Sequence, residues 1–237
     1  MRRGMFRKGS KIPVDSIQYF DTVIHPGDAV TVQEQELDHS VEVMRVPPIL
    51  LVKEEEMLSK KEARNRLGVP QAAEVWYVQL GAGQINDIES EIRITIEALL
   101  ENNPESIIVI GESLLGQRIT YSNERVRILR DYPNAVYFKG FDYSIQAGGY
   151  NSFHEMRSSR IPTIFYPNMN TGMDDQLARC KVAEKEGWGI VVEKRDAKSI
   201  HQAIQKTVKL ETEKSSTKQD EREHKWVSKL LQFPRNY

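Results

Sequence analysis

The chain has 237 residues, 39% hydrophobic and 28% charged, which is the composition of a soluble globular protein that can bury a core without disulfides or metals. Its 33 basic residues nearly balance its 34 acidic ones, so charge gives no reason to expect nucleic acid as a partner. Cys180 is the only cysteine in the sequence, which excludes an internal disulfide and favours a reducing, cytoplasmic compartment.

The first 58 residues differ from the rest. No apolar stretch of signal-peptide length follows the basic residues 1–8, and no run in the chain approaches the roughly 18 apolar residues of a membrane span. We expect a solvated end here, with contact to an anionic membrane at the cytoplasmic face as the alternative. Candidate strands at 17–24 and 41–46 flank the turn signal Pro26-Gly27. Residues 1–58 are too few for an ordinary α/β domain, so we treat them as an N-terminal segment.

Residues 59–237 alternate helix and strand patterns. A capping box at Ser59 and Glu62 begins a helix that Gly68 ends. Apolar runs predict strands at 75–80, 107–110, 135–138, 143–147, 162–166 and 188–192. Further helices are expected at 88–101, at 122–131, from about Asn151, at 174–186 and in the polar C-terminal region. The alternation predicts an α/β fold with a Rossmann-like parallel sheet and helices on both faces, which binds ligands at the carboxyl ends of its strands.

The connection from Ala147 to Glu155 is the most informative. Gly148 and Gly149 let the backbone approach a ligand, and the first turn of the next helix offers N–H groups to a phosphate. Glu155 follows this turn and can accept hydrogen bonds from hydroxyls such as those of a ribose. The alternative is a tight strand-to-helix turn with Glu155 merely solvated.

Two other connections carry weaker signals. Gly81-Ala-Gly83 lacks the third glycine of a dinucleotide fingerprint, so a phosphate-facing loop and an ordinary turn both remain open. After the strand at 162–166, Asp175 and Gln176 are candidates to bond sugar hydroxyls, or else residues of a helix cap. The adjacent acids Asp174 and Asp175 point in different directions on a helix, so no metal is expected.

Taken together, these segments resemble the C-terminal domain of GT-B glycosyltransferases. They are most similar to the bacterial GlcNAc transferase family of peptidoglycan lipid-intermediate synthesis. The resemblance rests on residues 141–155, 161–167 and 174–179, in the order strand, Gly-Gly, helix with Glu, strand with Pro, and Asp-Gln at a helix start. A weaker resemblance covers roughly residues 47–210.

The resemblance implies a role for each segment. Glu155 would hold the ribose of a UDP-sugar, Asp175 and Gln176 would face the sugar, and the loop at Phe138 and Lys139 would flank the base. Enzymes of this fold generally need no metal or other cofactor for the transfer. The full set of implied substrate-binding residues is Gly81, Gly83, Gln84, Phe138, Lys139, Gly148, Gly149, Tyr150, Asn151, Ser152, Glu155, Asp175 and Gln176.

Two departures from this family suggest an incomplete enzyme. The acceptor-binding N-terminal domain, which usually supplies the catalytic base, is represented at most by residues 1–58, leaving 59–237 as the donor-binding domain with C-terminal helices. The segment before Phe138 is also short. We therefore expect a hexosyl or N-acetylhexosaminyl transferase that is truncated or needs a partner, such as an acceptor-domain chain or a second copy; a split enzyme of this type occurs in eukaryotic dolichol-linked GlcNAc transfer. The alternatives are a non-catalytic sugar-nucleotide-binding subunit and an epimerase or hydrolase on the same fold.

The catalytic base is not evident from the sequence. Histidine side chains in general can act as bases near neutral pH, so His154 is a candidate, but it points about 100 degrees away from Glu155 on a helix. We favour a structural role for His154.

Overall fold

The computed structural model describes residues 19–30, 41–81, 88–112, 118–169 and 174–210. The described residues before Leu50 form one compact unit and those from Leu50 onward form another. The smaller unit contains two short parallel strands, β1 (Thr22–Pro26) and β2 (Glu42–Val46). Both strands were predicted, although β1 begins and ends later than expected. The side chains of His25 and Arg45 face each other across the pair, with 2.9 Å between Nδ1 and Nη1.

The larger unit carries the expected alternation of helices and strands. Its strands are β3 (Val75–Gln79), β4 (Ile107–Gly111), β5 (Val126–Leu129), β6 (Tyr143–Ala147), β7 (Thr163–Tyr166) and β8 (Gly189–Val191). Its helices are η3 (Glu54–Glu56), α1 (Lys60–Leu67), α2 (Ile88–Asn102), η4 (Asn134–Gly140), α3 (Tyr150–Ser159), α4 (Gln176–Lys185) and α5 (Ala197–Val208), where η marks a 3-10 helix.

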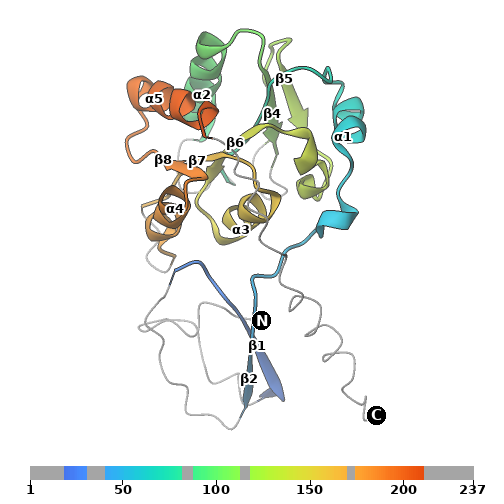
Figure 1. The fold of residues 1–237 in the computed structure, drawn as a ribbon, viewed down its shortest axis with the longest axis vertical. Helices are drawn as coiled ribbons and strands as arrows, with labels where there is room; N and C mark the ends of the chain where they lie inside the picture. The colour runs from blue at the N-terminus through green and yellow to red at the C-terminus, as the bar shows by residue number, and fades with distance from the viewer. Residues whose placement is uncertain (1–18, 31–40, 82–87, 113–117, 170–173, 211–237) are drawn as a thin grey trace. The chain divides into compact units, whose positions relative to one another are not determined.

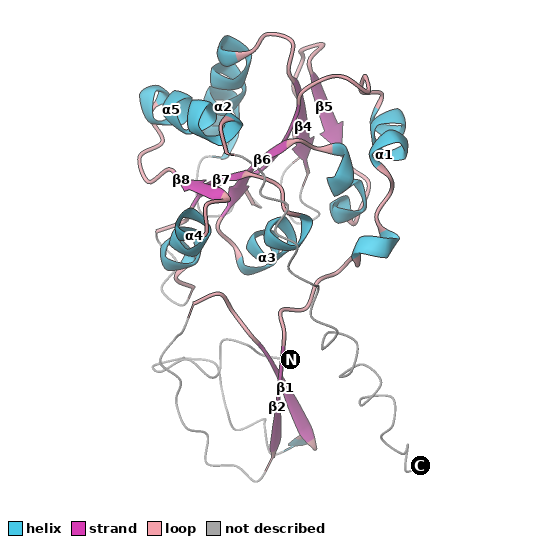
Figure 2. Ribbon diagram, in the orientation of Figure 1, coloured by secondary structure: helices cyan, strands magenta, loops and turns pink. Residues whose placement is uncertain are grey.

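The six strands form one parallel sheet in the order β5-β4-β3-β6-β7-β8. Helices cover both faces, with α2 and α5 on one side and α3 and α4 on the other (Figures 1 and 2). This arrangement confirms the predicted fold class. The strands are short apolar runs because a parallel sheet covered on both faces buries nearly every side chain.

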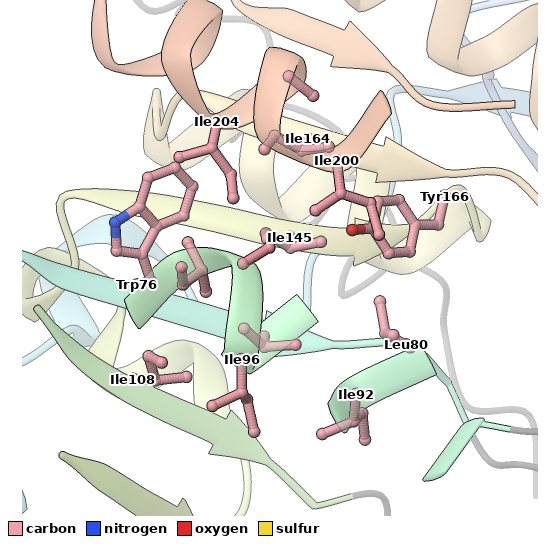
Figure 3. Close-up of a cluster of buried hydrophobic side chains, with 14 of the residues drawn as sticks. Trp76, Leu80, Ile92, Ile96, Ile108, Ile145, Ile164, Tyr166, Ile200 and Ile204 are labelled. Atoms are coloured by element: carbon pink, nitrogen blue, oxygen red, sulfur yellow. The ribbon is translucent and has the colours of Figure 1, made fainter. Parts of the chain in front are cut away.

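The face under α2 and α5 holds the main apolar core (Figure 3). Trp76, Val78 and Leu80 alternate along β3 toward this face, as the two-residue period of a strand requires. From α2, Ile92 and Ile96 pack onto them at the helical spacing predicted from the sequence.

The opposite face of the sheet carries aromatic side chains and is partly covered by α1, a helix that precedes the first strand of the sheet. The Tyr77 ring stacks on Phe141, with 4.7 Å between ring centroids. Helix α1 packs over this region against η4, so closely that a Cβ on Gly140 would lie 2.9 Å from the Cβ of Ala63. The buried Arg64 fastens the contact, because its Nε donates to the Gly140 carbonyl at 2.9 Å and its Nη2 to Asp142 at 2.6 Å.

Two predicted elements were wrong. The helix expected at 122–131 is instead the edge strand β5, which pairs with β4 on one side only. Charged residues on an edge strand weaken the apolar alternation that identifies inner strands. The strand expected at 135–138 is part of η4, and its apolar side chains are buried under α1. A short apolar run does not by itself distinguish a strand from a buried helical segment.

None of the helices in the described ranges is long and apolar enough to cross a bilayer.

Candidate functional site

The strand order defines the place where a ligand site is expected. From β3 the chain moves outward to β4 and β5, then returns to pair β6 with β3 and continues the other way to β7 and β8. The connections after β3 and β6 therefore leave the sheet in opposite directions. In open α/β sheets the crevice at such a switch point is the usual ligand site. The two glycine turns singled out from the sequence follow these two strands.

Helix α3 begins at this switch point without a side-chain cap. Its N-cap residue is Gly149, which has no side chain to accept a hydrogen bond. By contrast, α1, α4 and α5 each begin at a residue whose side chain accepts from the first turn, namely Ser59, Asp175 and Asp196. The first N–H groups of a helix need acceptors and mark the positive end of its dipole. The start of α3 is therefore suited to an anionic ligand.

The two glycines of this turn have different roles. A Cβ on Gly148 would lie 2.4 Å from the Cys180 Sγ, so this glycine lets α4 pack against the turn. Among the described residues, a Cβ on Gly149 would meet nothing within 4 Å. Sequence reasoning assigned both glycines to close approach by a ligand, whereas the structure gives Gly148 a packing role and leaves Gly149 bordering open space.

Glu155 lies about one turn into α3 and is half-buried. Burial raises the pKa of its carboxyl to about 7. Among the described residues, none forms a hydrogen bond or ion pair with this carboxyl. Burial raises the pKa of the Tyr77 hydroxyl, and the negative charge of the Glu155 carboxylate raises it further. Glu155 is thus a desolvated acceptor that a ligand's hydroxyls can bond.

The start of α4 is tied to the neighbouring loops. Asp175 caps the helix, accepting from the Ala178 N–H at 2.9 Å. The Gln176 Oε1 accepts from the backbone N–H of Asn168 at 2.9 Å. The capping interpretation of Asp175 therefore holds in this structure, and Gln176 links the start of α4 to Asn168, two residues after β7.

The remaining candidate residues are placed as follows. Gly81 lies two residues after β3 and has a φ of +96°, a conformation that favours glycine, whereas Gly83 and Gln84 lie outside the described residues. The Phe138 ring is 2% exposed and packs on Tyr77 and Phe141, so this side chain belongs to the core and does not flank a base. The Lys139 Nζ donates to the Glu54 carbonyl at 2.9 Å.

Three side chains of α3 complete the candidate set. Asn151 is exposed and Ser152 is half-buried, both in the uncapped first turn. Tyr150 lies beside His154, with 4.5 Å between ring centroids. His154 is 4% exposed and also contacts the Phe153 ring, a setting that agrees with the structural role we favoured for it.

No three His, Cys, Asp or Glu side chains gather as a metal site within the ranges that the structure describes.

No protein-family model matches the chain, and no curated protein matches its sequence. Solved structures do match its fold. The spinosyn forosaminyltransferase SpnP superposes with a TM-score of 0.55 at 12% identity, over 79% of this chain and 46% of that one. The calicheamicin glycosyltransferase CalG4 gives a TM-score of 0.52 at 16% identity, over 80% and 43% of the two chains. The fold is that of GT-B-type glycosyltransferases.

A further structure with this fold has a different activity in its name. The UDP-GlcNAc 2-epimerase from Methanocaldococcus jannaschii superposes with a TM-score of 0.51 at 14% identity, over 73% of this chain and 49% of that one. The chain therefore spans less than half the length of each of these three proteins. Their likeness establishes a GT-B fold, and the narrower resemblance to the peptidoglycan GlcNAc transferases stays a hypothesis.

One residue beside this candidate site was given no role by sequence reasoning. The side chain of Arg179 is fully buried in α4 and bonds the Gly148 carbonyl, whereas the sequence analysis included it in the segment 174–179 without assigning it a role. Arg179 is 31 residues from Gly148 along the chain, and neither residue type nor spacing predicts that the two are in contact.

Proposed function

We propose that this chain is the donor-binding half of a GT-B glycosyltransferase and holds a UDP-sugar at the switch point between β3 and β6. One observation carries the proposal. Of the α-helices whose N-cap residue is described, α3 is the one that begins without a side-chain cap, and it does so at the switch point. About one turn further on is a carboxyl that has no hydrogen-bond partner among the described residues. An anion acceptor and a hydroxyl acceptor lie side by side on one helix, which matches the diphosphate and ribose of a sugar nucleotide.

The diphosphate would lie against Gly149 and the first turn of α3. The backbone N–H groups there and the positive end of the helix dipole favour a phosphate, and the open space beside Gly149 lets it approach the backbone. Because these groups supply fixed positive potential, the proposed complex needs no metal ion to balance the diphosphate.

The nucleoside and the sugar would lie on either side of the diphosphate. Glu155 would accept hydrogen bonds from the ribose hydroxyls, and the bonds gained on binding would favour its ionised form. Asp175 and Gln176, at the start of α4, would face the transferred sugar. The base would contact the backbone around Lys139, because the Phe138 ring is occupied in the core.

Sugar transfer would need an acceptor-binding domain in addition to this chain. The chain covers less than half of both glycosyltransferases named above, and His154 is too buried to reach a substrate. A base must take the acceptor's proton, and the acceptor must be held against the sugar carbon. We propose that a second chain or domain supplies both functions.

Calorimetry with UDP, with and without EDTA, tests the binding step. We expect binding that EDTA does not change. No detectable heat at about millimolar UDP, a concentration at which even weak sites fill, or strict dependence on a metal ion, would overturn the proposal.

Product analysis tests the chemistry. The chain is incubated with labelled UDP-GlcNAc and UDP-glucose, first alone and then with an acceptor-domain chain plus lipid and small-molecule acceptors. Transfer only in the second mixture is the expected result. If the isolated chain formed an epimerised UDP-sugar, it would instead be an epimerase, and if it released free sugar, it would be a hydrolase.

A further inference from the structure

Arg179 occupies an unusual position behind the proposed diphosphate turn. Its side chain is 0% exposed, and its Nη1 donates to the carbonyl oxygen of Gly148 at 2.9 Å. Its Nη2 donates to Asp174 Oδ1 at 2.5 Å. The guanidinium also lies 5.7 Å from the centre of the Tyr150 ring, the first residue of α3. One side chain therefore contacts the last turn before α3, the first residue of α3 and the loop before α4.

The surrounding packing leaves the turn little freedom. Gly148 is pressed against α4, because a Cβ there would lie 2.4 Å from the Cys180 Sγ and 3.2 Å from the Gln176 Cβ. The same helix start holds Asn168, just after β7, through the bond from the Asn168 N–H to Gln176. The first two turns of α4 thus contact both Asn168 and the glycine turn, and Arg179 makes the polar link to that turn.

Burying a guanidinium is costly unless it is paired and hydrogen-bonded, and Arg179 meets both conditions. The side chain of its carboxylate partner Asp174 is a quarter exposed, so the guanidinium of the pair is buried and the carboxylate lies near the surface. A planar guanidinium binds two acceptors in fixed directions, which an ammonium on a flexible stem does not. Arg179 therefore fixes where the Gly148 carbonyl lies, and with it the peptide planes that follow.

We infer that Arg179 is a positioning residue for diphosphate binding, an inference that rests on the proposed function. It holds the Gly148–Gly149 turn so that the first N–H groups of α3 face the ligand. No ligand touches the guanidinium itself, because the side chain is fully buried. Loss of this bond reduces affinity for ligands that carry the diphosphate and leaves affinity for the nucleoside alone unchanged.

Arg179→Lys tests the inference, and Arg64→Lys is its matched control. Arg64 is also a buried arginine, 1% exposed, that bonds a glycine carbonyl and an aspartate, but it lies between α1 and η4. The measurement is the affinity of each purified variant for UDP by calorimetry and for uridine by ligand-observed NMR, with urea denaturation to record stability.

The expected result is a change in the ratio of the two affinities. Arg179→Lys should lower UDP affinity about tenfold relative to uridine, the size of one weakened charge-assisted hydrogen bond. Arg64→Lys should lower stability and leave the ratio unchanged. An unchanged ratio in Arg179→Lys, or an equal change in both variants, would overturn the inference.

A second variant covers the case in which Arg179→Lys does not fold. Asp174→Asn changes a partly exposed residue and removes the charge that orients the guanidinium. We expect the UDP-to-uridine ratio to fall in this variant too, by about twofold to threefold for a neutral bond in place of a charged one; a ratio equal to that of the original chain would then count against the inference. If the original chain itself binds neither UDP nor uridine, the proposed function has failed, whereas normal UDP binding with unchanged ratios in the variants defeats the inference alone.

Discussion

Glu155→Gln should make the protein more stable at neutral pH than the original chain. The pKa of this carboxyl is raised from 4.5 to about 7 by burial, so folding disfavours its ionised form. Below pH 4.5 the carboxyl is protonated in both the folded and the unfolded state. Between pH 4.5 and 7 the unfolded state releases the proton while the folded state keeps it, and the free energy of unfolding falls. Above pH 7 the loss is complete.

The size of the effect follows from the shift. The rise from 4.5 to about 7 corresponds to at most about 3 kcal/mol of unfolding free energy at pH 8, and to about 1 kcal/mol at pH 5. Glutamine has nearly the same shape and no titrating group. The stability difference between Glu155→Gln and the original chain should therefore grow by about 2 kcal/mol from pH 5 to pH 8.

Urea denaturation of both proteins at several pH values measures this difference. Glu62→Gln is a control of opposite sign, because hydrogen bonds from Ser59 lower the pKa of Glu62. That variant should be less stable than the original chain, with a difference that stays flat from pH 5 to pH 8. A flat difference for Glu155→Gln as well would refute the reasoning, since it would mean that the carboxyl is ionised in the folded state at pH 5.

Three further predictions concern the site itself. UDP-sugar affinity of the original chain should increase from pH 6 to pH 8 in calorimetry, because the ionised Glu155 is the better acceptor; Glu155→Gln should remove this dependence and weaken binding about tenfold to a hundredfold. A pH-independent affinity would contradict this role. The ligand is a UDP-sugar because the terminal phosphate of UDP titrates in the same pH range and would add a pH dependence of its own. Gly148→Ala should lower stability by about 1–3 kcal/mol through its clash with Cys180, whereas Gly149→Ala should fold normally and lose UDP affinity; similar denaturation curves for the two would show that the glycines do not differ. Burial raises the pKa of the Cys180 thiol to about 12, so a thiol reagent at pH 8 should label it only when urea unfolds the chain, and fast labelling of the folded protein would contradict its buried position.

The inner strands were predictable from the sequence because burial on both faces demands an apolar residue at nearly every position. Val75 to Leu80 and Ile107 to Ile110 show this most clearly, and both lie in the middle of the sheet. Segments at 126–129 and 134–140 were not predictable, since the first is an edge strand interrupted by the charged Arg127 and the second depends on cover from α1. Local pattern carries no information about such neighbours.

The candidate site was predictable in its backbone and less so in its side chains. Gly149, Glu155 and the start of α3 lie together because the chain order of one strand, turn and helix places them there. Phe138 and Arg179 depend on contacts between segments distant in the sequence. An aromatic residue in a loop and an arginine in a helix both suggest surface positions, and only the packed structure shows that they are buried.

The contact between α1 and η4 also decides where this folding unit begins. The first strand of the sheet is an obvious choice for the start of a domain fragment, and here that strand starts at Val75. A fragment cut at Val75 would lose Arg64 and uncover Gly140 and the aromatic side chains beneath η4. The smallest piece that carries its own core must therefore begin before Ser59. A recombination event that transferred the sheet without α1 would leave an apolar surface exposed to solvent, and such a surface favours aggregation.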